Sequence, residues 1–186
     1  MHYIGKKISP FTVQAFHRGD FKTITEERLD GMWSVFVFYP ADFTFVCPTE
    51  LGDLADIYSD FLKIGCEVYA VSTDTHFTHK AWCDVSETIQ RVTYPMLADP
   101  THTLCKDFGV LIESEGQALR GTFIVDPQRE IVAYEVHSPG IGRNVRETLR
   151  TVQAAQFVSN SDEVCPAGWI PGKPTISPSI DLVGKI

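Results

Sequence analysis

Two short apolar runs separated by one amphipathic segment constrain the fold of this chain more than any other feature. Residues 33–39, WSVFVFY, and residues 66–72, CEVYAVS, are rich in β-branched and aromatic side chains, as is typical of buried strands. Between them, apolar residues recur at helical spacing over 49–64, and Gly65 follows at the expected helix end. This alternation predicts a layered α/β fold.

The later segments extend the same pattern. Residues 76–90 are predicted to form a second helix, whose apolar face is marked by the recurring Phe77, Ala81, Val85 and Ile89. Residues 121–126 and 130–137 are predicted to form a β-hairpin, and residues 143–158 a final amphipathic helix. A hairpin beside strands joined by helices gives a mixed sheet. Beyond residue 160 the segment becomes rich in proline and glycine, and an extended tail is expected there.

Composition and charge exclude several classes of protein. The chain has 186 residues, 44% of them hydrophobic and 22% charged, which suits one globular domain. Its net charge of -8 and pI near 5.2 do not favour nucleic acid or anionic lipid as a partner. No apolar stretch approaches the roughly 20 residues of a membrane helix, and the first residues lack the apolar core of a secretory signal. A cytoplasmic location is expected.

The cysteines do not form a structural disulfide framework. There are five, an odd number, and their spacing contains neither a C-x-x-C motif nor a zinc-type pattern. Cys47 stands out, because Pro48 suits the first position of the helix that follows and would place Cys47 at the N-cap. The positive end of a helix dipole favours a thiolate there.

The helix alone is not enough to activate this thiol. A helix terminus contributes about 0.3–1 kcal/mol to an anion, less than a free thiol needs in order to ionise at neutral pH. A cation must supply the rest, and arginine, with its permanent charge and planar fork of donors, suits that role. The alternative is that Cys47 is a small buried side chain at a strand–helix junction, and the local sequence leaves both interpretations open.

Two longer motifs carry a family resemblance. The segment FYPADFTFVCPTELGD, residues 38–53, contains the pattern P-x-x-x-T-x-x-C, formed by Pro40, Thr44 and Cys47. A second segment, DEVCPAGW, contains Cys165. With further similarity from KISPFTVQAF near the start to PSIDLVGKI at the end, the chain resembles the typical two-cysteine peroxiredoxins, above all their bacterial alkyl hydroperoxide reductase members.

The resemblance implies a fold and an activity. The expected fold is α/β and thioredoxin-like, with a central mixed β-sheet flanked by helices. Residues 1–160 would form the peroxidase domain, and residues 161–186 a C-terminal arm. The implied activity is the thiol-dependent reduction of hydrogen peroxide, alkyl hydroperoxides and peroxynitrite, in antioxidant defence.

The two motif cysteines receive distinct roles from the resemblance. Cys47 would attack the peroxide and become a sulfenic acid, and Cys165 of the partner subunit would resolve it as an intersubunit disulfide. Because the two sulfurs must meet, the start of the helix near Cys47 would unwind during turnover. Thr44 would hold the peroxide with the backbone N–H groups of residues 46 and 47, and Pro40 would exclude water. Without the motif, Cys165 would be a surface cysteine in a frayed tail.

Three charged residues complete the implied site. Arg120, in ALRGTFIVD, matches an arginine that activates the thiolate and polarises the peroxide. Arg143, in GIGRNVRE, matches a second arginine of the pocket, and Glu50 would orient both. From the residues alone, Arg120 and Arg143 would be interpreted as solvated charges at a strand start and a helix start.

The resemblance also implies partners. Members of this type are homodimers that assemble into ring-shaped decamers, and residues 74–82 match a segment that packs between dimers; the alternative there is an ordinary amphipathic helix. The reductant would be a flavoprotein disulfide reductase of the AhpF type or a thioredoxin-type protein. No cofactor is expected, because the cysteines carry the electrons themselves.

The remaining candidates suggest no separate site. Cys66 and Cys105 are expected in the core, whereas Cys83 is predicted on a more exposed helix face. His76 and His79 lie three positions apart without the spacing of a zincin, which favours solvent-facing or packing histidines over metal ligands. The G-x-G of residues 139–143 lacks any accompanying nucleotide-binding pattern.

Other functions remain open at this stage. A thiol–disulfide oxidoreductase is one, although the missing C-x-x-C argues against it, and a peroxide sensor or oligomeric chaperone is another. The chain also lacks the Gly-Gly-Leu-Gly loop and terminal Tyr-Phe of oxidation-sensitive relatives. We therefore expect Cys47 to resist overoxidation to sulfinic acid.

Overall fold

The computed structural model describes residues 2–185 and divides into two compact units. The first spans Met1–Val145 and the second Arg146–Ile186. The second unit therefore begins within the last long helix. The division expected at residue 160, between a peroxidase domain and a C-terminal arm, stays a prediction.

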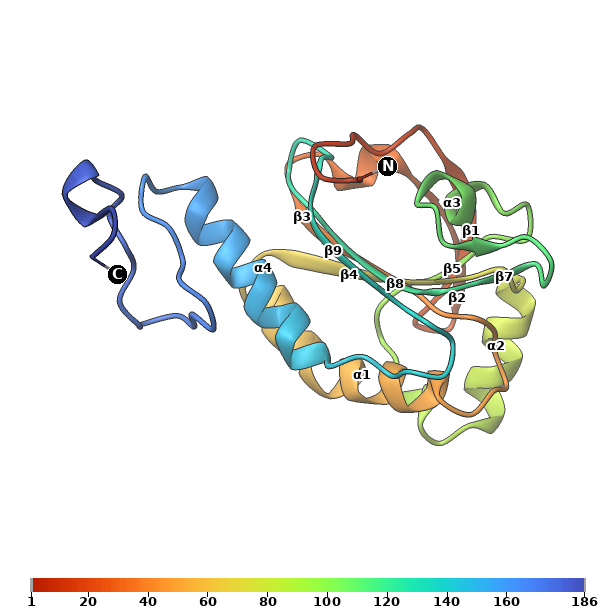
Figure 1. Cartoon of the computed structure of the whole chain (residues 1–186). Coiled ribbons are helices and arrows are strands. Elements are labelled where there is room, and N and C mark those ends of the chain that lie inside the picture. Colours follow the sequence, from red (N-terminus) through yellow and green to blue (C-terminus); the bar gives the residue numbers. More distant parts are fainter. Residues whose placement is uncertain (1, 186) are drawn as a thin grey trace. The chain divides into compact units, whose positions relative to one another are not determined.

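A mixed seven-stranded sheet forms the centre of the first unit (Figure 1). Its strand order is β2-β1-β5-β4-β3-β8-β9. Strands β3, β4 and β5 are parallel, and the remaining neighbours pair antiparallel, which confirms the predicted mixed sheet. The strands are β1 (Thr12–His17), β2 (Asp20–Thr25), β3 (Trp33–Phe38), β4 (Cys66–Ser72), β5 (Met96–Ala98), β8 (Arg120–Val125) and β9 (Ile131–His137), with β6 (Leu111–Ile112) and β7 (Gln117–Ala118) forming a separate pair.

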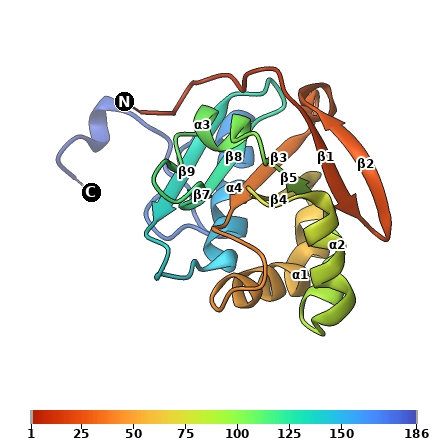
Figure 2. The ribbon, with the colours of Figure 1, turned by 90° about the vertical axis from the view of Figure 1, so that its right-hand side faces the viewer.

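Helices cover both faces of the sheet. Helices α1 (Cys47–Lys63) and α2 (His76–Val85) lie on one face, and the short α3 (Thr103–Asp107) lies on the other with the N-terminal segment (Figures 1 and 2). Two 3-10 turns, Glu26–Leu29 and Ile89–Arg91, complete the connections. Within residues 2–185, no helix is both long and apolar enough to cross a bilayer.

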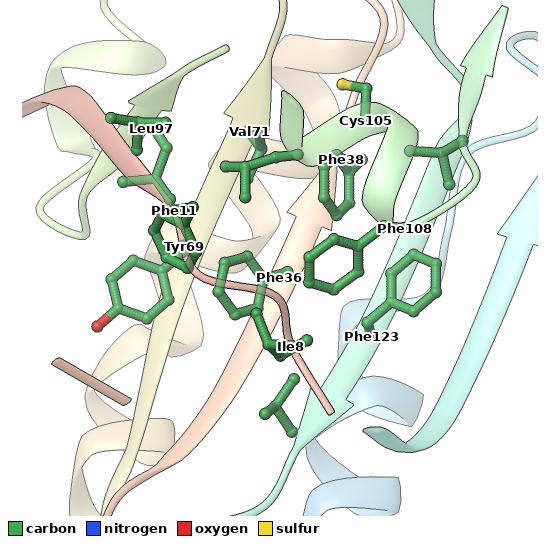
Figure 3. Packing of buried hydrophobic residues seen from close by; sticks show 14 of the residues in the cluster. Ile8, Phe11, Phe36, Phe38, Tyr69, Val71, Leu97, Cys105, Phe108 and Phe123 are labelled. Atoms are coloured by element: carbon green, nitrogen blue, oxygen red, sulfur yellow. The ribbon is translucent and has the colours of Figure 1, made fainter. Parts of the chain in front are cut away.

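The main hydrophobic cluster lies on the face covered by α3 (Figure 3). Aromatic rings from three elements meet there: Phe36 lies 5.1 Å from Phe108, and Phe108 lies 4.9 Å from both Phe38 and Phe123, measured between ring centroids. All four rings are almost fully buried, and ring pairs in such tilted and edge arrangements stabilise a core beyond their buried area. The cluster fixes β3 and β8, the two strands that lead into the candidate site.

The predicted starts and ends of the helices need small corrections. Helix α1 begins at Cys47, and Val46 is its N-cap, so Cys47 is not the N-cap residue that the position of Pro48 suggested. The reason is that the Val46 carbonyl already accepts hydrogen bonds from the N–H groups of Thr49 and Glu50. Cys47 therefore occupies the first helical turn, where backbone N–H groups have no partner within the helix.

Helix α2 is shorter than predicted and buries a different face. It ends at Val85, because Ser86 is extended. Phe77 and Val85, on the expected apolar face, are 63% and 71% exposed. Cys83 was expected on the more exposed face, and this was wrong: its side chain is buried, close to the Ile89 carbonyl and the sulfur of Met96.

The second unit consists of helix α4 and an ordered tail. Helix α4 (Val145–Ser159) is followed by an irregular segment in which Val164 and Ile176 form an antiparallel bridge. Trp169 packs on Phe157 with ring centroids 5.2 Å apart, and its indole N–H donates to the Lys173 carbonyl. The 3-10 turn Ile180–Leu182 lies near its end.

Candidate active site

The sulfur of Cys47 lies in a buried pocket of charge at the start of α1. The side chain has no exposed surface, yet Arg120 Nη1 lies 3.4 Å from its Sγ, within hydrogen-bonding distance for sulfur. Arg120 is the first residue of β8, so a strand adjacent to β3 brings the guanidinium to the helix that follows β3. The structure thus places an arginine beside the thiol, the cation that a thiolate there would require in addition to the helix dipole.

Glu50 binds both guanidinium groups of the site. Its Oε2 accepts from Arg120 Nη1 at 2.6 Å and from Arg143 Nη2 at 2.9 Å, and its Oε1 accepts from Arg143 Nε at 2.9 Å and from the Arg143 backbone N–H at 2.8 Å. All three side chains are buried, at 2–3% exposure. The expectation that Glu50, Arg120 and Arg143 lie together is therefore met in the structure, as a bidentate pair with a second arginine beside it.

The backbone holds both arginines in place. Arg120 Nε donates to the Pro139 carbonyl at 2.7 Å, and Arg143 Nη1 donates to the Gly121 carbonyl at 2.8 Å and to Thr122 Oγ1 at 3.2 Å. These acceptors were not found from the sequence, because a backbone carbonyl leaves no residue-type signal. They orient the planar forks, so the position of the positive charge is fixed before any substrate arrives.

The charges of the cluster do not cancel. Two guanidinium groups and one carboxylate leave one positive charge, beside a sulfur that has no contact with bulk water. Burial by itself would raise the pKa of Glu50, but the hydrogen bonds and charge of Arg143, together with the charge of Arg120, outweigh burial and lower the pKa of this carboxyl. The carboxyl is therefore ionised at neutral pH. A thiolate on Cys47 would balance the remaining positive charge.

Pro40 and Thr44 lie in the connection between β3 and α1. Pro40 is buried, and Thr44 is partly exposed, with its hydroxyl donating to the Ala41 carbonyl at 2.9 Å. Gly142 approaches this connection closely: a Cβ atom there would meet Val46 Cγ1 at 3.4 Å, so the loop before Arg143 packs against the residue before Cys47.

Cys165 belongs to the second unit. It is partly exposed, and its Sγ lies 3.9 Å from the Ala154 carbonyl of α4. Cys47, by contrast, belongs to the first unit.

The other three cysteines are buried in neutral or acidic surroundings. Burial raises the pKa of the Cys83 thiol to about 12, with Asp42 and Asp84 adding to the effect. Burial likewise raises the pKa of Cys66 and of Cys105, and in each case a neighbouring carboxylate raises it further. These thiols stay protonated and packed. Core positions for Cys66 and Cys105 agree with the prediction.

A second buried polar cluster adjoins the site and was missed in the sequence. His79, considered there only as a metal ligand or a packing residue, is fully buried and lies 2.7 Å from Asp42 through its Nδ1. Among residues 2–185, no group of three or more histidine, cysteine or acidic side chains is arranged to hold a metal. The only available signal was that Asp42 falls within the segment between Pro40 and Thr44.

A thioredoxin-like fold with a cysteine at a helix start, beside an arginine–glutamate–arginine cluster, defines the peroxiredoxin class. The chain belongs to the AhpC/TSA family, whose model matches residues 4–134. A second model, the C-terminal domain of 1-Cys peroxiredoxin, matches residues 154–185.

Individual relatives agree with this assignment over the full length. The chain is 58% identical to alkyl hydroperoxide reductase C of Escherichia coli strain K12 and 53% identical to that of Bacillus subtilis strain 168, covering 100% of each chain in both comparisons. The crystal structure of Enterococcus faecalis AhpC superposes with a TM-score of 0.87 at 50% identity, covering 89% of this chain and 100% of that one. Reduced 2-Cys peroxiredoxin of Plasmodium vivax superposes with a TM-score of 0.93 at 31% identity, covering 97% and 96%.

Proposed function

We propose that this chain is a peroxidase that reduces hydrogen peroxide and alkyl hydroperoxides through Cys47. The observation that carries the proposal is the 3.4 Å contact between Cys47 Sγ and a guanidinium whose cluster holds one uncompensated positive charge. A buried charge of that kind stabilises an anion at the sulfur far more than the same charge would in water. The names of the relatives, alkyl hydroperoxide reductase C, support the same activity.

The chemistry transfers one oxygen atom. The Cys47 thiolate attacks the terminal oxygen of the hydroperoxide, the S–O bond forms, and the O–O bond breaks. The departing alkoxide, or hydroxide from hydrogen peroxide, takes up a proton and leaves as alcohol or water. The sulfur is oxidised by two electrons to a sulfenic acid, and the peroxide is reduced by the same two.

The loop before the helix would position the peroxide. In this proposal the Thr44 hydroxyl and the N–H groups of residues 46 and 47 hold the peroxide oxygens, and Arg120 polarises the bond that breaks. Pro40 excludes water from the thiolate. The burial of Pro40 and the fixed guanidinium of Arg120 support these roles.

Cys165 is proposed to complete the cycle from the partner subunit. Its thiol attacks the sulfenic acid of Cys47, giving an intersubunit disulfide and one water molecule. The partial exposure of Cys165, in a segment rich in proline and glycine, supports this assignment. We accordingly propose a homodimer, assembled into ring-shaped decamers through residues 74–82, with residues 161–186 as the arm.

The disulfide must then be reduced by another protein. We propose a flavoprotein disulfide reductase of the AhpF type or a thioredoxin-type reductant, and a cytoplasmic location where such reductants are maintained. The dithiol of either reductant attacks the Cys47–Cys165 disulfide by thiol–disulfide exchange and gives up two electrons. Both cysteines return to thiols, and the reductant is left as a disulfide.

A non-reducing gel tests the cysteine chemistry. Wild type, Cys47→Ser, Cys165→Ser and the control Cys105→Ser are each treated with one equivalent of hydrogen peroxide. Wild type and Cys105→Ser should form a covalent dimer, whereas neither Cys47→Ser nor Cys165→Ser should form one. A covalent dimer in Cys47→Ser would contradict the proposal.

Peroxide consumption with a dithiol reductant separates the enzyme from its alternatives. Wild type should turn over many equivalents, because the disulfide is reduced in each cycle. Oxidation that stops at one equivalent would instead indicate a peroxide sensor, and no consumption would indicate a thiol–disulfide oxidoreductase.

A further inference from the structure

The segment that leads from β3 to Cys47 is fixed at Asp42 by a buried network. The Asp42 carboxylate lies between two side chains: Oδ1 accepts from the Tyr39 hydroxyl at 2.7 Å, and Oδ2 faces His79 Nδ1 at 2.7 Å. The Asp42 backbone N–H donates to Asp74 Oδ2 at 2.8 Å. Side chain and backbone of one residue are thus held by three different elements, the end of β3, helix α2 and the segment after β4.

The network contains no exposed group at its centre. Tyr39 and His79 have no exposed surface, and Asp42 is 6% exposed. Burial, and then the charge of Asp42, raises the pKa of Tyr39 well above its ordinary value, so its hydroxyl remains a donor. Buried and fully satisfied polar networks are rigid, because a displaced member leaves an unpaired group in a medium of low dielectric.

The second ring nitrogen of His79 ties the network to the sheet. Nε2 lies 3.2 Å from the Leu97 carbonyl of β5, so each ring nitrogen faces an acceptor. The position of Asp42 is therefore set by the sheet through the imidazole ring.

Backbone strain directly after Asp42 shows that the connection is constrained. Phe43 has φ of 57°, in the left-handed region that residues other than glycine seldom adopt, and its ring lies 5.9 Å from that of Trp82 on α2. Such a conformation is strained and persists only where the surroundings enforce it. Here the anchored Asp42 lies on one side of Phe43, and Thr44, bonded to the Ala41 carbonyl, lies on the other.

We propose that the Asp42–His79 pair has a positioning role: it holds the peroxide-binding loop, residues 40–46, in a fixed position relative to Cys47. This inference rests on the proposed function, because it assumes that Pro40 and Thr44 act on the peroxide. The pair touches neither the sulfur nor its arginines, so its contribution is to the placement of the peroxide and not to the charge on sulfur. A displacement of about 1 Å at such a loop costs roughly 100-fold in rate.

Two substitutions at one position separate positioning from packing. The amide nitrogen of asparagine takes the place of His79 Nδ1 and can donate to Asp42, whereas that of glutamine takes the place of Nε2 and can donate only to the Leu97 carbonyl. His79→Gln should therefore lower the second-order rate constant of Cys47 with hydrogen peroxide at least about tenfold, and His79→Asn should retain the rate within about threefold.

Alkylation of Cys47 by iodoacetamide supplies the second readout. Because the arginine cluster remains intact, this rate should stay within about twofold of wild type in both variants. Asp99→Asn is the matched control: Asp99 is equally buried, but its carboxylate accepts from the N–H groups of Leu104 and Cys105 in α3, away from the loop. It should lose stability to urea and keep the peroxide rate.

Several results would overturn the proposal. It fails if His79→Gln and His79→Asn lose the peroxide rate equally, if neither loses it, or if Asp99→Asn loses as much. It also fails if alkylation slows in parallel with peroxide reduction. The proposed function is tested separately by wild-type turnover, which none of these results affects.

Discussion

Cys47 and Cys105 are equally buried, but the charged group beside each thiol has the opposite sign. Neither side chain has any exposed surface. Cys47 lies 3.4 Å from the Arg120 guanidinium, whereas Cys105 lies in α3 beside the Asp99 carboxylate, which accepts a hydrogen bond from its backbone N–H. Burial, and then Asp99, raises the pKa of Cys105. The comparison teaches that depth of burial alone does not define the surroundings of a thiol: Cys47 has a fixed cation beside its sulfur, whereas Cys105 has a carboxylate beside it.

The largest effect should come from exchanging the sulfur of Cys47 for oxygen, with the same exchange at Cys105 as the control. Cys47→Ser should lower the peroxide rate constant roughly 1,000-fold or more, because a serine hydroxyl is not ionised beside the cation. Cys105→Ser should leave the rate within about twofold. Stopped-flow peroxide consumption by folded protein measures both, and an equal loss would remove the distinction between the two thiols.

The next effect concerns the cation itself. Arg120→Met keeps the length of the side chain and removes its charge, and we expect a loss of about 100- to 1,000-fold in the peroxide rate. Arg120→Lys should recover part of it, since a point charge replaces the fork. The comparison between Cys47 and Cys105 would be mistaken if Arg120→Met reduced peroxide at the wild-type rate.

A smaller effect is expected in the pH dependence of the free energy of unfolding, to which the charged cluster contributes. The pKa of Glu50 is lowered in the folded protein from its ordinary value of 4.5. Its contribution to stability is therefore complete above pH 4.5 and is lost as the pH falls through the lower folded value. Urea unfolding between pH 3 and 7 should show this loss in wild type, and Glu50→Gln should have a flatter profile. An unchanged slope would mean that Glu50 has the same pKa in both states.

The smallest effect tests the packing role of Cys105. Cys105→Ala should reduce the free energy of unfolding by about 1 kcal/mol, as expected for removing a buried atom of this size. Peroxide turnover should not change. A gain in stability would show that the sulfur is strained, and a loss of turnover would give Cys105 a part in the chemistry.

The sequence predicted the central elements because their signals are local. The run at 66–72 coincides with β4, a strand in which six of the seven residues are buried, as a continuous apolar run predicts. Strand β5 was missed because it has only three residues, and β2 because four of its six residues are exposed. The apolar residues Phe77 and Val85 misled the assignment of faces on α2, since a hydrophobic pattern does not distinguish a core from an outer surface.

The candidate site was predictable only in part. Cys47 has a local signal, the proline and the helix that follow it, whereas Arg120 and Arg143 were identified through the family motif. Their meeting with Glu50 depends on strand order, which places residues 70 and 93 positions apart within 3 Å. Asp42 and His79 form their contact in the same way, across 37 positions, and no spacing rule reveals it.

The two buried clusters also set how far the reactive sulfur can travel. Asp42 is linked through His79 to β5, and Glu50 is bonded to Arg120 of β8, so a first turn that uncoils in the proposed cycle would stay tethered at both ends. The shorter tether runs from Glu50 to Cys47, three residues, which spans about 10 Å when fully stretched. In the proposed cycle, the resolving thiol would have to come the rest of the way itself, so the reach of residues 161–186, and not that of the helix, would limit which chains can be joined.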